Sequence, residues 1–232
     1  MPARVNSVTE SADACVMILN RLQGHLESIY EVQSGYRVAD FLIDDPALAR
    51  CMDISANARD IPEKLLIRQD GDSVDLALYL DPDLLQRLDA NDPTESLHGE
   101  NLHDFWLALE GISHFLYLTW NASHERSVTL LEMELQAEVD KFILAAFLFG
   151  RQMRGLVPRA LYRHLFEYAR FDERLNDAER YRYRSANYFA GRFCSYIEKE
   201  FMQPGARSGL VNTLRRFYRL TQQRKIKAIR HL

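Results

Sequence analysis

The sequence predicts a mainly α protein, α+β overall, in which a small N-terminal part with a β-hairpin precedes an antiparallel helical bundle. Three observations support this class. Two alternating apolar runs meet at a tight-turn dipeptide, which predicts a hairpin. Helical periodicity dominates from residue 101 onward. A polar, turn-rich stretch at residues 89–100 separates the part with the hairpin from the helical part. We therefore expect an acidic α+β part over residues 1–95 and a helical bundle with basic C-terminal helices over residues 96–232.

The N-terminal part should contain a helix, the hairpin and a short second helix. Apolar side chains at helical spacing predict the first helix over residues 10–33, whereas residues 36–43 fit either a strand or a helix. Residues 64–80 predict the hairpin, because Asp70-Gly71 suits the positive φ of a tight turn between two alternating runs. A short helix with Asp81 as its N-cap should follow.

The rest of the chain has the periodicity of helices throughout. Proline cannot continue a helix and glycine commonly ends one, so Pro158 and Pro204-Gly205 mark two of the breaks. Connections as short as these favour antiparallel neighbours. The expected helices cover residues 101–121, 125–150, 159–174, 177–202 and 208–230.

Composition excludes several classes of protein. Apolar residues make up 47% and charged residues 27% of the chain, values unlike those of a disordered protein. No apolar run approaches the roughly 20 residues that span a bilayer, and the N-terminus lacks the pattern of a secretory signal. Cys15, Cys51 and Cys194 have no paired spacing, which favours a reducing compartment over disulfides or a zinc site. We expect a cytoplasmic protein, with Cys194 as a small core residue.

Charge is distributed very unevenly along the chain. Residues 1–149 carry 26 acidic and 10 basic side chains, whereas residues 150–232 carry 7 and 19. A net charge of −16 is therefore followed by one of +12, although the whole chain has a net charge of only −4. Such asymmetry indicates contact with nucleic acid or a membrane surface, or two halves that neutralise each other.

Tyrosine and arginine recur along one face of the expected helix 177–202, opposite its apolar stripe. The segment from Leu214 onward then contains seven basic side chains and no acidic one. Guanidinium groups pair with phosphates, and aromatic rings stack on bases, so this part of the chain suits a polyanion. The candidate binding residues are Tyr181, Arg184, Tyr188, Arg192, Arg215, Arg216, Arg219, Arg224, Lys225 and Lys227.

Other uses of these basic helices compete with nucleic-acid binding. They could present a solvated face, dock on the acidic half of the same chain, or contact an acidic protein partner, since tyrosine and arginine are enriched at binding hot spots. A membrane is disfavoured, because Tyr and Arg dominate the segment rather than Trp, Leu and Lys. The exposed aromatic side chains would also permit a homo-oligomer.

A second candidate site consists of carboxylates and a histidine in the bundle. Glu138 falls within the apolar stripe of the expected helix 125–150, and Glu134 lies at its edge. Glu110 and His114 border the apolar face of the helix before it. If the two helices fold back on each other, opposite residues have numbers that add to about 248, so these four side chains would cluster.

A carboxylate on a core stripe is costly unless it is paired, hydrogen-bonded or neutralised. The cluster could be a site for a divalent metal ion, such as Mg²⁺, Mn²⁺ or iron, that activates water. It could equally be a structural polar network that fixes the register of the helices. The spacing lacks the Glu-x-x-His pairs of di-iron bundles, and the chain contains no nucleophile elbow, phosphate loop or zinc-protease motif. No catalytic residue is therefore assigned.

These features lead to two functional hypotheses. We expect a non-catalytic cytosolic binding protein or accessory subunit without a cofactor, whose basic C-terminal helices contact a polyanion (DNA or RNA) or an acidic protein partner. The alternative is a metal-dependent hydrolase of a phosphorylated substrate, in which the Glu/His cluster holds the ion and the basic helices hold the phosphates.

Overall fold

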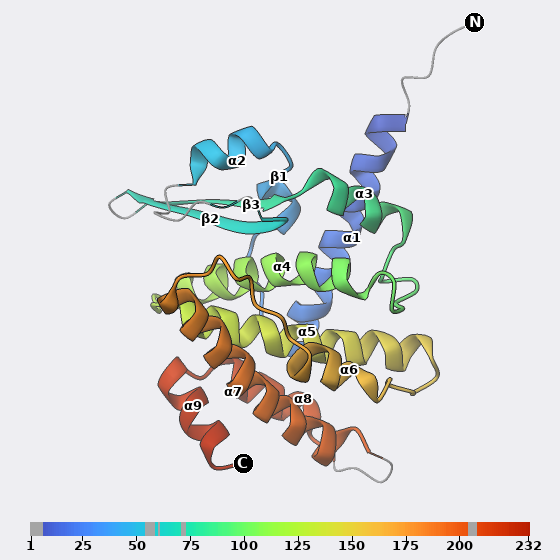
Figure 1. The fold of residues 1–232 in the computed structure, drawn as a ribbon, viewed down its shortest axis with the longest axis vertical. Coiled ribbons are helices and arrows are strands. Elements are labelled where there is room, and N and C mark those ends of the chain that lie inside the picture. Colours follow the sequence, from blue (N-terminus) through green and yellow to red (C-terminus); the bar gives the residue numbers. More distant parts are fainter. Residues whose placement is uncertain (1–6, 54–58, 60, 71–72, 204–207) are drawn as a thin grey trace, which may run out of the picture. The chain divides into compact units, whose positions relative to one another are not determined.

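The computed structural model describes residues 7–53, 59, 61–70, 73–203 and 208–232 (Figure 1). It confirms the expected class, because helices dominate and the described strands form one small three-stranded sheet. These residues fall into two compact units, the first drawn from 1–24 and 35–116 and the second from 25–34 and 117–232. The expected domains at 1–95 and 96–232 stay a prediction. No helix in the described ranges is long and apolar enough to cross a membrane.

In the first unit the predicted hairpin is confirmed. Strands β2 (Glu63–Asp70) and β3 (Ser73–Leu80) pair antiparallel, with Leu66 opposite Ala77, although Gly71 of the predicted turn lies outside the described residues. The ambiguous segment 36–43 forms a 3-10 helix and then strand β1 (Leu42–Ile43), which is parallel to β3. The α-helices of this unit are the start of α1 (Ser7–Tyr30), α2 (Pro46–Met52), α3 (Pro82–Ala90) and most of α4 (Leu102–Ala122).

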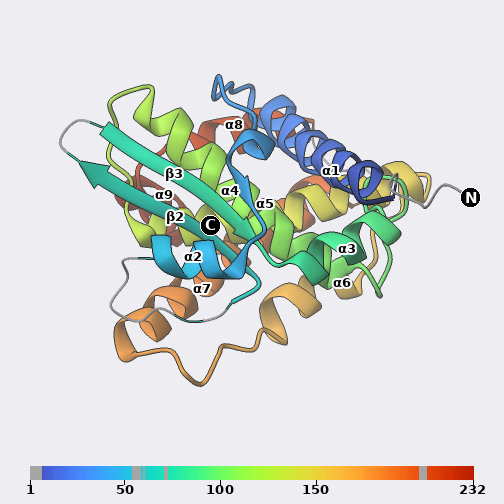
Figure 2. The same ribbon diagram turned by 90° about the horizontal axis from the view of Figure 1, so that it is seen from above.

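Apolar side chains cover both faces of the sheet. Leu66 and Ala77 project to one face and pack with Ala49 of α2, which lies along the hairpin in Figure 2. Leu78 projects to the other face, where α4 comes so close that a Cβ at Gly111 would lie 2.5 Å from Leu78 Cδ1. A side chain at position 111 would therefore force Leu78 or the helix to move, and glycine permits the close contact.

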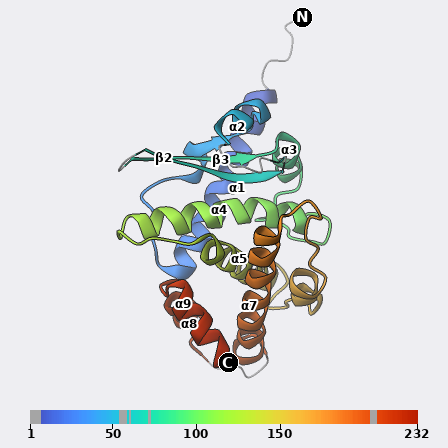
Figure 3. The same ribbon diagram turned by 60° about the vertical axis from the view of Figure 1, so that its left-hand side comes forward.

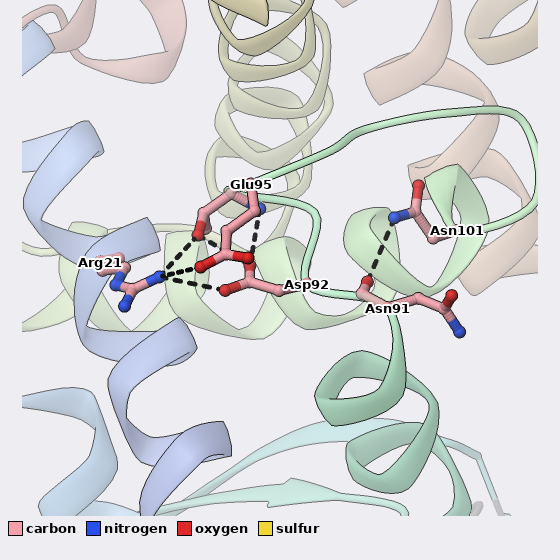
Figure 4. Close-up of polar contacts among 6 residues, drawn as sticks. Arg21, Asn91, Asp92, Glu95 and Asn101 are labelled. Atoms are coloured by element: carbon pink, nitrogen blue, oxygen red, sulfur yellow. Dashed lines mark hydrogen bonds and ion pairs between the residues drawn. The ribbon is translucent and has the colours of Figure 1, made fainter.

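Residues 91–100 form a hydrogen-bonded loop of the first unit rather than a loose linker (Figure 4). Arg21 of α1 forms an ion pair with Asp92 at 3.1 Å and lies 3.8 Å from Glu95. The side-chain amide of Asn101 donates to the Asn91 carbonyl oxygen at 3.1 Å. The polar residues of this stretch therefore form contacts that fix the loop against α1 and the start of α4.

In the second unit, α5 packs along α7, and α9 also contacts α7 (Figure 3). The side chain of Asn176 and that of Glu179 form a reciprocal capping box, which begins α7 where the sequence predicts a helix. Besides the ends of α1 and α4, the α-helices of this unit are α5 (Leu130–Gln152), α6 (Ala160–Tyr162), α7 (Asp177–Phe201), α8 (Leu210–Tyr218) and α9 (Gln222–Arg230).

The helix expected over residues 159–174 is wrong in its second half. After α6 the chain makes a π-helical turn, Arg163–Glu167, and then leaves helical conformation. The side-chain amide of Asn187, on α7, donates to the Leu165 carbonyl oxygen at 3.2 Å. In a longer helix, a backbone N–H of the next turn would have bonded to the Leu165 carbonyl. Here a side chain of α7 takes that role, so the tertiary contact prevails over the helical pattern of the sequence.

The single helix expected over residues 208–230 is also wrong, because α8 and α9 are separate helices. Thr221 has an extended backbone, with φ −69° and ψ 161°, and precedes the first residue of α9. Threonine is a favoured N-cap residue, so the sequence did contain a signal for this break. The break expected at Pro204-Gly205 lies outside the described residues.

Within the second unit, the end of α4 and the start of α5 have the expected antiparallel register. Tyr117 Oη donates to Glu132 Oε1 at 2.6 Å, in keeping with opposite residue numbers that add to about 248. Farther along the unit, Phe193 of α7 stacks on Phe217 of α8, with 3.8 Å between ring centroids. Cys194 is fully buried, which confirms its expected place in the core.

Candidate functional site

Two tyrosines and two arginines of α7 project away from the core, as the sequence predicts. Tyr181 and Tyr188 are 73% and 57% exposed, and Arg184 and Arg192 are also exposed. The opposite side of the helix, which includes Ala190, is buried. We call Tyr181, Arg184, Tyr188 and Arg192 the cationic row.

None of the carboxylates that the structure describes neutralises the two arginines of the cationic row. Neither Arg184 nor Arg192 forms an ion pair with a residue that the structure describes, and Arg192 Nη1 lies 3.5 Å from Tyr188 Oη. Arg182, on another side of α7, lies 3.4 Å from the carboxylate of Glu134. Along this one helix, the arginine beside α5 is therefore paired with a carboxylate, and the arginines that face outward are not.

We call the chain from Leu214 to the end the basic segment. Two of its arginines, Arg215 and Arg219, bind the end of α1. Arg215 donates to the Ile29 carbonyl oxygen at 3.1 Å and forms an ion pair with Glu31 at 3.0 Å. Arg219 donates to the carbonyl oxygens of Tyr30 and Glu31, both at 3.0 Å. The last carbonyls of a helix lack partners within it, so these two arginines complete the C-terminus of α1.

Lys225 corrects the predicted set of binding residues. The sequence places it on the basic surface, but its side chain is fully buried. Its Nζ donates to Gln136 Oε1 at 2.6 Å and lies 4.4 Å from the centre of the Tyr117 ring. Burial lowers the pKa of Lys225 to about 7, although the nearby carboxyl groups of Glu132 and Asp140 act in the opposite direction. Lys225 is therefore a core residue and no partner can reach it on the surface.

Lys225 belongs to a buried polar cluster in the second unit. Gln136 Nε2 donates to Asp140 Oδ1 at 2.7 Å, and Tyr30 Oη donates to the same oxygen at 2.5 Å. Burial raises the pKa of the Tyr30 hydroxyl, and the neighbouring carboxyl group of Asp140 raises it further. We call Lys225, Gln136, Asp140, Tyr30, Tyr117 and Glu132 the Lys225 cluster. Each member is buried and hydrogen-bonded, so the cluster fixes how four helices meet.

The Lys225 cluster was not predicted from the sequence, although the chain carries a signal for it. Glu132, Gln136 and Asp140 follow each other at intervals of four residues, which places three polar side chains on one face of α5. All three are buried. Polar groups repeated on one face of a buried helix require partners, and Lys225 is one of them.

The remaining predicted cations surround a pocket. Arg216, Arg224 and Lys227 are exposed and line a pocket of about 450 Å³ between α7, α8 and α9. Phe193 and Tyr196 of α7 contribute to its wall, and no Asp or Glu is among the residues that line it. Within the described part of the chain, none of the three cations forms an ion pair. We call this the C-terminal pocket.

The candidate metal ligands belong to two helices. Glu110 and His114 lie on the part of α4 that belongs to the first unit, and Glu134 and Glu138 lie on α5 in the second. Glu138 forms an ion pair with Lys141 at 2.9 Å, and Glu134 lies beside an arginine of α7. Positive side chains next to both α5 carboxylates fit the structural interpretation of this cluster. The metal site stays a prediction.

The first unit contains a pocket of its own, with a different charge pattern. It measures about 680 Å³ and lies between α2, the sheet and α3, with side chains of both signs in its wall. Lys64 in that wall forms an ion pair with Asp53, and Arg87 forms one with Asp104 at 2.9 Å. Because its charges offset one another, this pocket favours anions less than the C-terminal pocket does.

Comparison of the chain with protein families, with curated proteins and with solved structures finds no match. Its function is therefore inferred from the chemistry of its own side chains. The cationic row and the C-terminal pocket are the candidate functional site.

Proposed function

We propose that this is a non-catalytic binding protein that holds an anionic partner, a nucleic acid or an acidic protein surface, against its C-terminal helices. The observation that carries the proposal is a set of exposed cations with neither an ion pair nor a backbone carbonyl partner among the described residues. They are Arg184 and Arg192 of the cationic row, and Arg216, Arg224 and Lys227 of the C-terminal pocket.

The chemistry of these side chains supports an anionic partner. Guanidinium groups bind phosphates and carboxylates through two parallel hydrogen bonds, and cations gathered on one surface attract anions over several ångströms. The tyrosines of the cationic row add large, rigid contact area, which is typical of binding hot spots. At 1.5 Å per residue, the row from Tyr181 to Arg192 extends for about 16 Å, enough to contact a short segment of a partner.

Ionic strength should control the interaction. About five phosphate contacts give a log–log salt slope of about −4.5 for duplex DNA, because each neutralised phosphate releases a counterion. The seven basic side chains after Leu214 overstate what α8 and α9 offer, since Arg215, Arg219 and Lys225 are used inside the protein.

The test is a fluorescence anisotropy titration at low salt with four labelled anions: single-stranded DNA, duplex DNA, single-stranded RNA and a polyglutamate peptide. We expect at least one of them to bind, with an affinity that falls as NaCl is added. The double variant Arg184→Ala/Arg192→Ala should weaken binding.

A matched control removes two other exposed arginines of the second unit, in the variant Arg159→Ala/Arg163→Ala. This control should bind as the unaltered protein does. Absence of binding to all four anions, or an equal loss in both double variants, would contradict the proposed function.

A further inference from the structure

We propose that the C-terminal pocket receives one apolar side chain from an acidic segment of a partner protein, while carboxylates of that segment pair with the cations around the pocket. This inference rests on the proposed function and specifies the chemistry of the partner.

Apolar side chains form much of the pocket wall. The stacked rings of Phe193 and Phe217 lie there together with Leu220 and Ala228. Covering apolar surface that is otherwise open to water is favourable, so the occupant should itself present an apolar group. With a volume of about 450 Å³, the pocket can accept a large side chain.

Cations on two helices surround this apolar surface. Arg224, Lys227 and Ala228 share one face of α9, because they are three and four residues apart. Arg216 approaches from α8, and none of the described residues that line the pocket has an acidic side chain. An occupant that is complementary in charge must therefore carry negative groups beside its apolar one.

The cationic row leads into the pocket along α7. Tyr196 lines the pocket and follows Arg192 by one turn, which places it about 40° farther round the helix. From Arg184 to Tyr196, α7 rises by about 18 Å and the side-chain direction turns by about 120°, so an extended segment that reaches both has at least five or six residues. A segment of that length could place acidic side chains along the row and its apolar side chain in the pocket.

The lining favours a peptide over a nucleic acid. A nucleobase carries nitrogen and oxygen atoms on its edges, and burying them without hydrogen bonds is unfavourable. Apart from the cations, the polar side chains that line the pocket are those of Tyr196, Thr213 and His231. A leucine or phenylalanine side chain makes no such demand, and its flanking carboxylates would satisfy the guanidinium groups.

The experiment measures anisotropy with labelled hexapeptides that contain five glutamates and one variable residue, Leu, Phe or Ala. The Leu and Phe peptides should bind about tenfold more tightly than the Ala peptide, because each would bury a side chain in the pocket. Single-stranded DNA of six nucleotides is titrated in parallel.

Two variants block the pocket and leave its cations in place. Ala228→Trp fills it from α9, and Thr213→Trp fills it from α8. With either variant, the Leu and Phe peptides should bind only about as tightly as the Ala peptide. The affinity for the Ala peptide itself should not fall. Ala122→Trp, at an exposed helical alanine outside the pocket, serves as the matched control and should keep the advantage.

The outcomes separate this inference from the proposed function. Equal binding of all three peptides would overturn the pocket assignment and leave the proposed function standing. Binding of DNA that the blocking variants weaken, with no advantage for Leu or Phe, would assign the pocket to nucleic acid and overturn the inference. If no anion binds, both proposals fail.

Discussion

The cationic row of α7 and the basic segment of α8 and α9 contain the same kinds of side chain and use them differently. In the row, Arg184 and Arg192 face outward without a carboxylate partner among the described residues. In the basic segment, Arg215 and Arg219 bind the end of α1, and Lys225 lies in the core. The number of cations in a segment therefore overstates the number that are left without a partner inside the protein.

The difference follows from what each helix packs against. The side of α7 that carries Arg184 and Arg192 is exposed, whereas α8 and α9 meet carbonyl groups at the end of α1 and the polar face of α5. Unpaired carbonyls and buried carboxyl groups both attract donors with positive charge. Basic side chains of α8 and α9 that lie next to these groups therefore bind them. The other basic side chains of α8 and α9 are left available for a partner.

The largest expected effect is on the Lys225 cluster. Replacing Asp140 by Ala removes the acceptor of Tyr30 and Gln136 and leaves two buried donors unsatisfied, at about 1–3 kcal/mol each. Urea unfolding should therefore show a loss of about 2–5 kcal/mol for Asp140→Ala. The control Asp40→Ala removes an exposed ion pair with Arg37 and should cost less than about 1 kcal/mol. Equal losses would show that the cluster does not stabilise the fold.

The second expected effect is a rise in stability with pH that depends on Lys225. Its pKa is lowered from 10.5 to about 7 in the folded protein, so above pH 7 the unfolded chain binds a proton that the folded protein has lost. Stability should then increase with pH by up to about 1.4 kcal/mol per unit, or about 2 kcal/mol from pH 7 to 8.5. Below pH 7 both states are protonated, and this gain is absent.

Urea unfolding of Lys225→Met over the same pH range isolates this contribution. Methionine has no proton to lose, so the variant should show little change between pH 7 and 8.5. An identical rise in the variant and the unaltered protein would assign the pH dependence to other groups.

The third expected effect separates two arginines of the same segment. Arg219→Ala leaves two carbonyls of α1 without their donor and should cost about 1–2 kcal/mol in unfolding free energy, with little change in anion binding. Arg216→Ala should do the reverse, changing stability by less than about 0.5 kcal/mol while weakening the binding of polyglutamate. If both variants lost stability equally, the distinction between structural and available cations would be wrong.

The smallest expected effect concerns the candidate metal ligands. If Glu134 and Glu138 are structural, elemental analysis of the purified protein should find no stoichiometric metal, and EDTA should leave its melting temperature unchanged. A bound ion that disappears in Glu138→Ala would instead support the metal-dependent alternative.

Much of the fold could be predicted because it follows local rules. Alternating apolar runs gave the hairpin, and the apolar stripe of α7 correctly set its exposed face. The predicted helix over 159–174 failed because a side chain of α7 supplies the partner of the Leu165 carbonyl. Such a bond comes from a distant part of the chain, and no local pattern encodes it.

Only the part of the candidate site that follows from local periodicity was predicted. Arg184 and Arg192 were correctly expected on the surface, because periodicity alone decides which face of α7 points outward. Lys225 was wrongly predicted to lie on the surface. A single lysine near the apolar Ile229 does not indicate that it packs beside carboxyl groups of α5. The C-terminal pocket was missed because its wall combines three helices whose packing the sequence does not specify.

The most direct test of which cations a partner can reach is the rate at which phenylglyoxal modifies each arginine, read by mass spectrometry. In the free protein, Arg184, Arg192, Arg216 and Arg224 should react several times faster than Arg215 and Arg219, which are held by α1. Saturating polyglutamate should then slow the fast group and leave the slow group unchanged. Equal rates in the free protein, or no protection by the anion, would contradict this account.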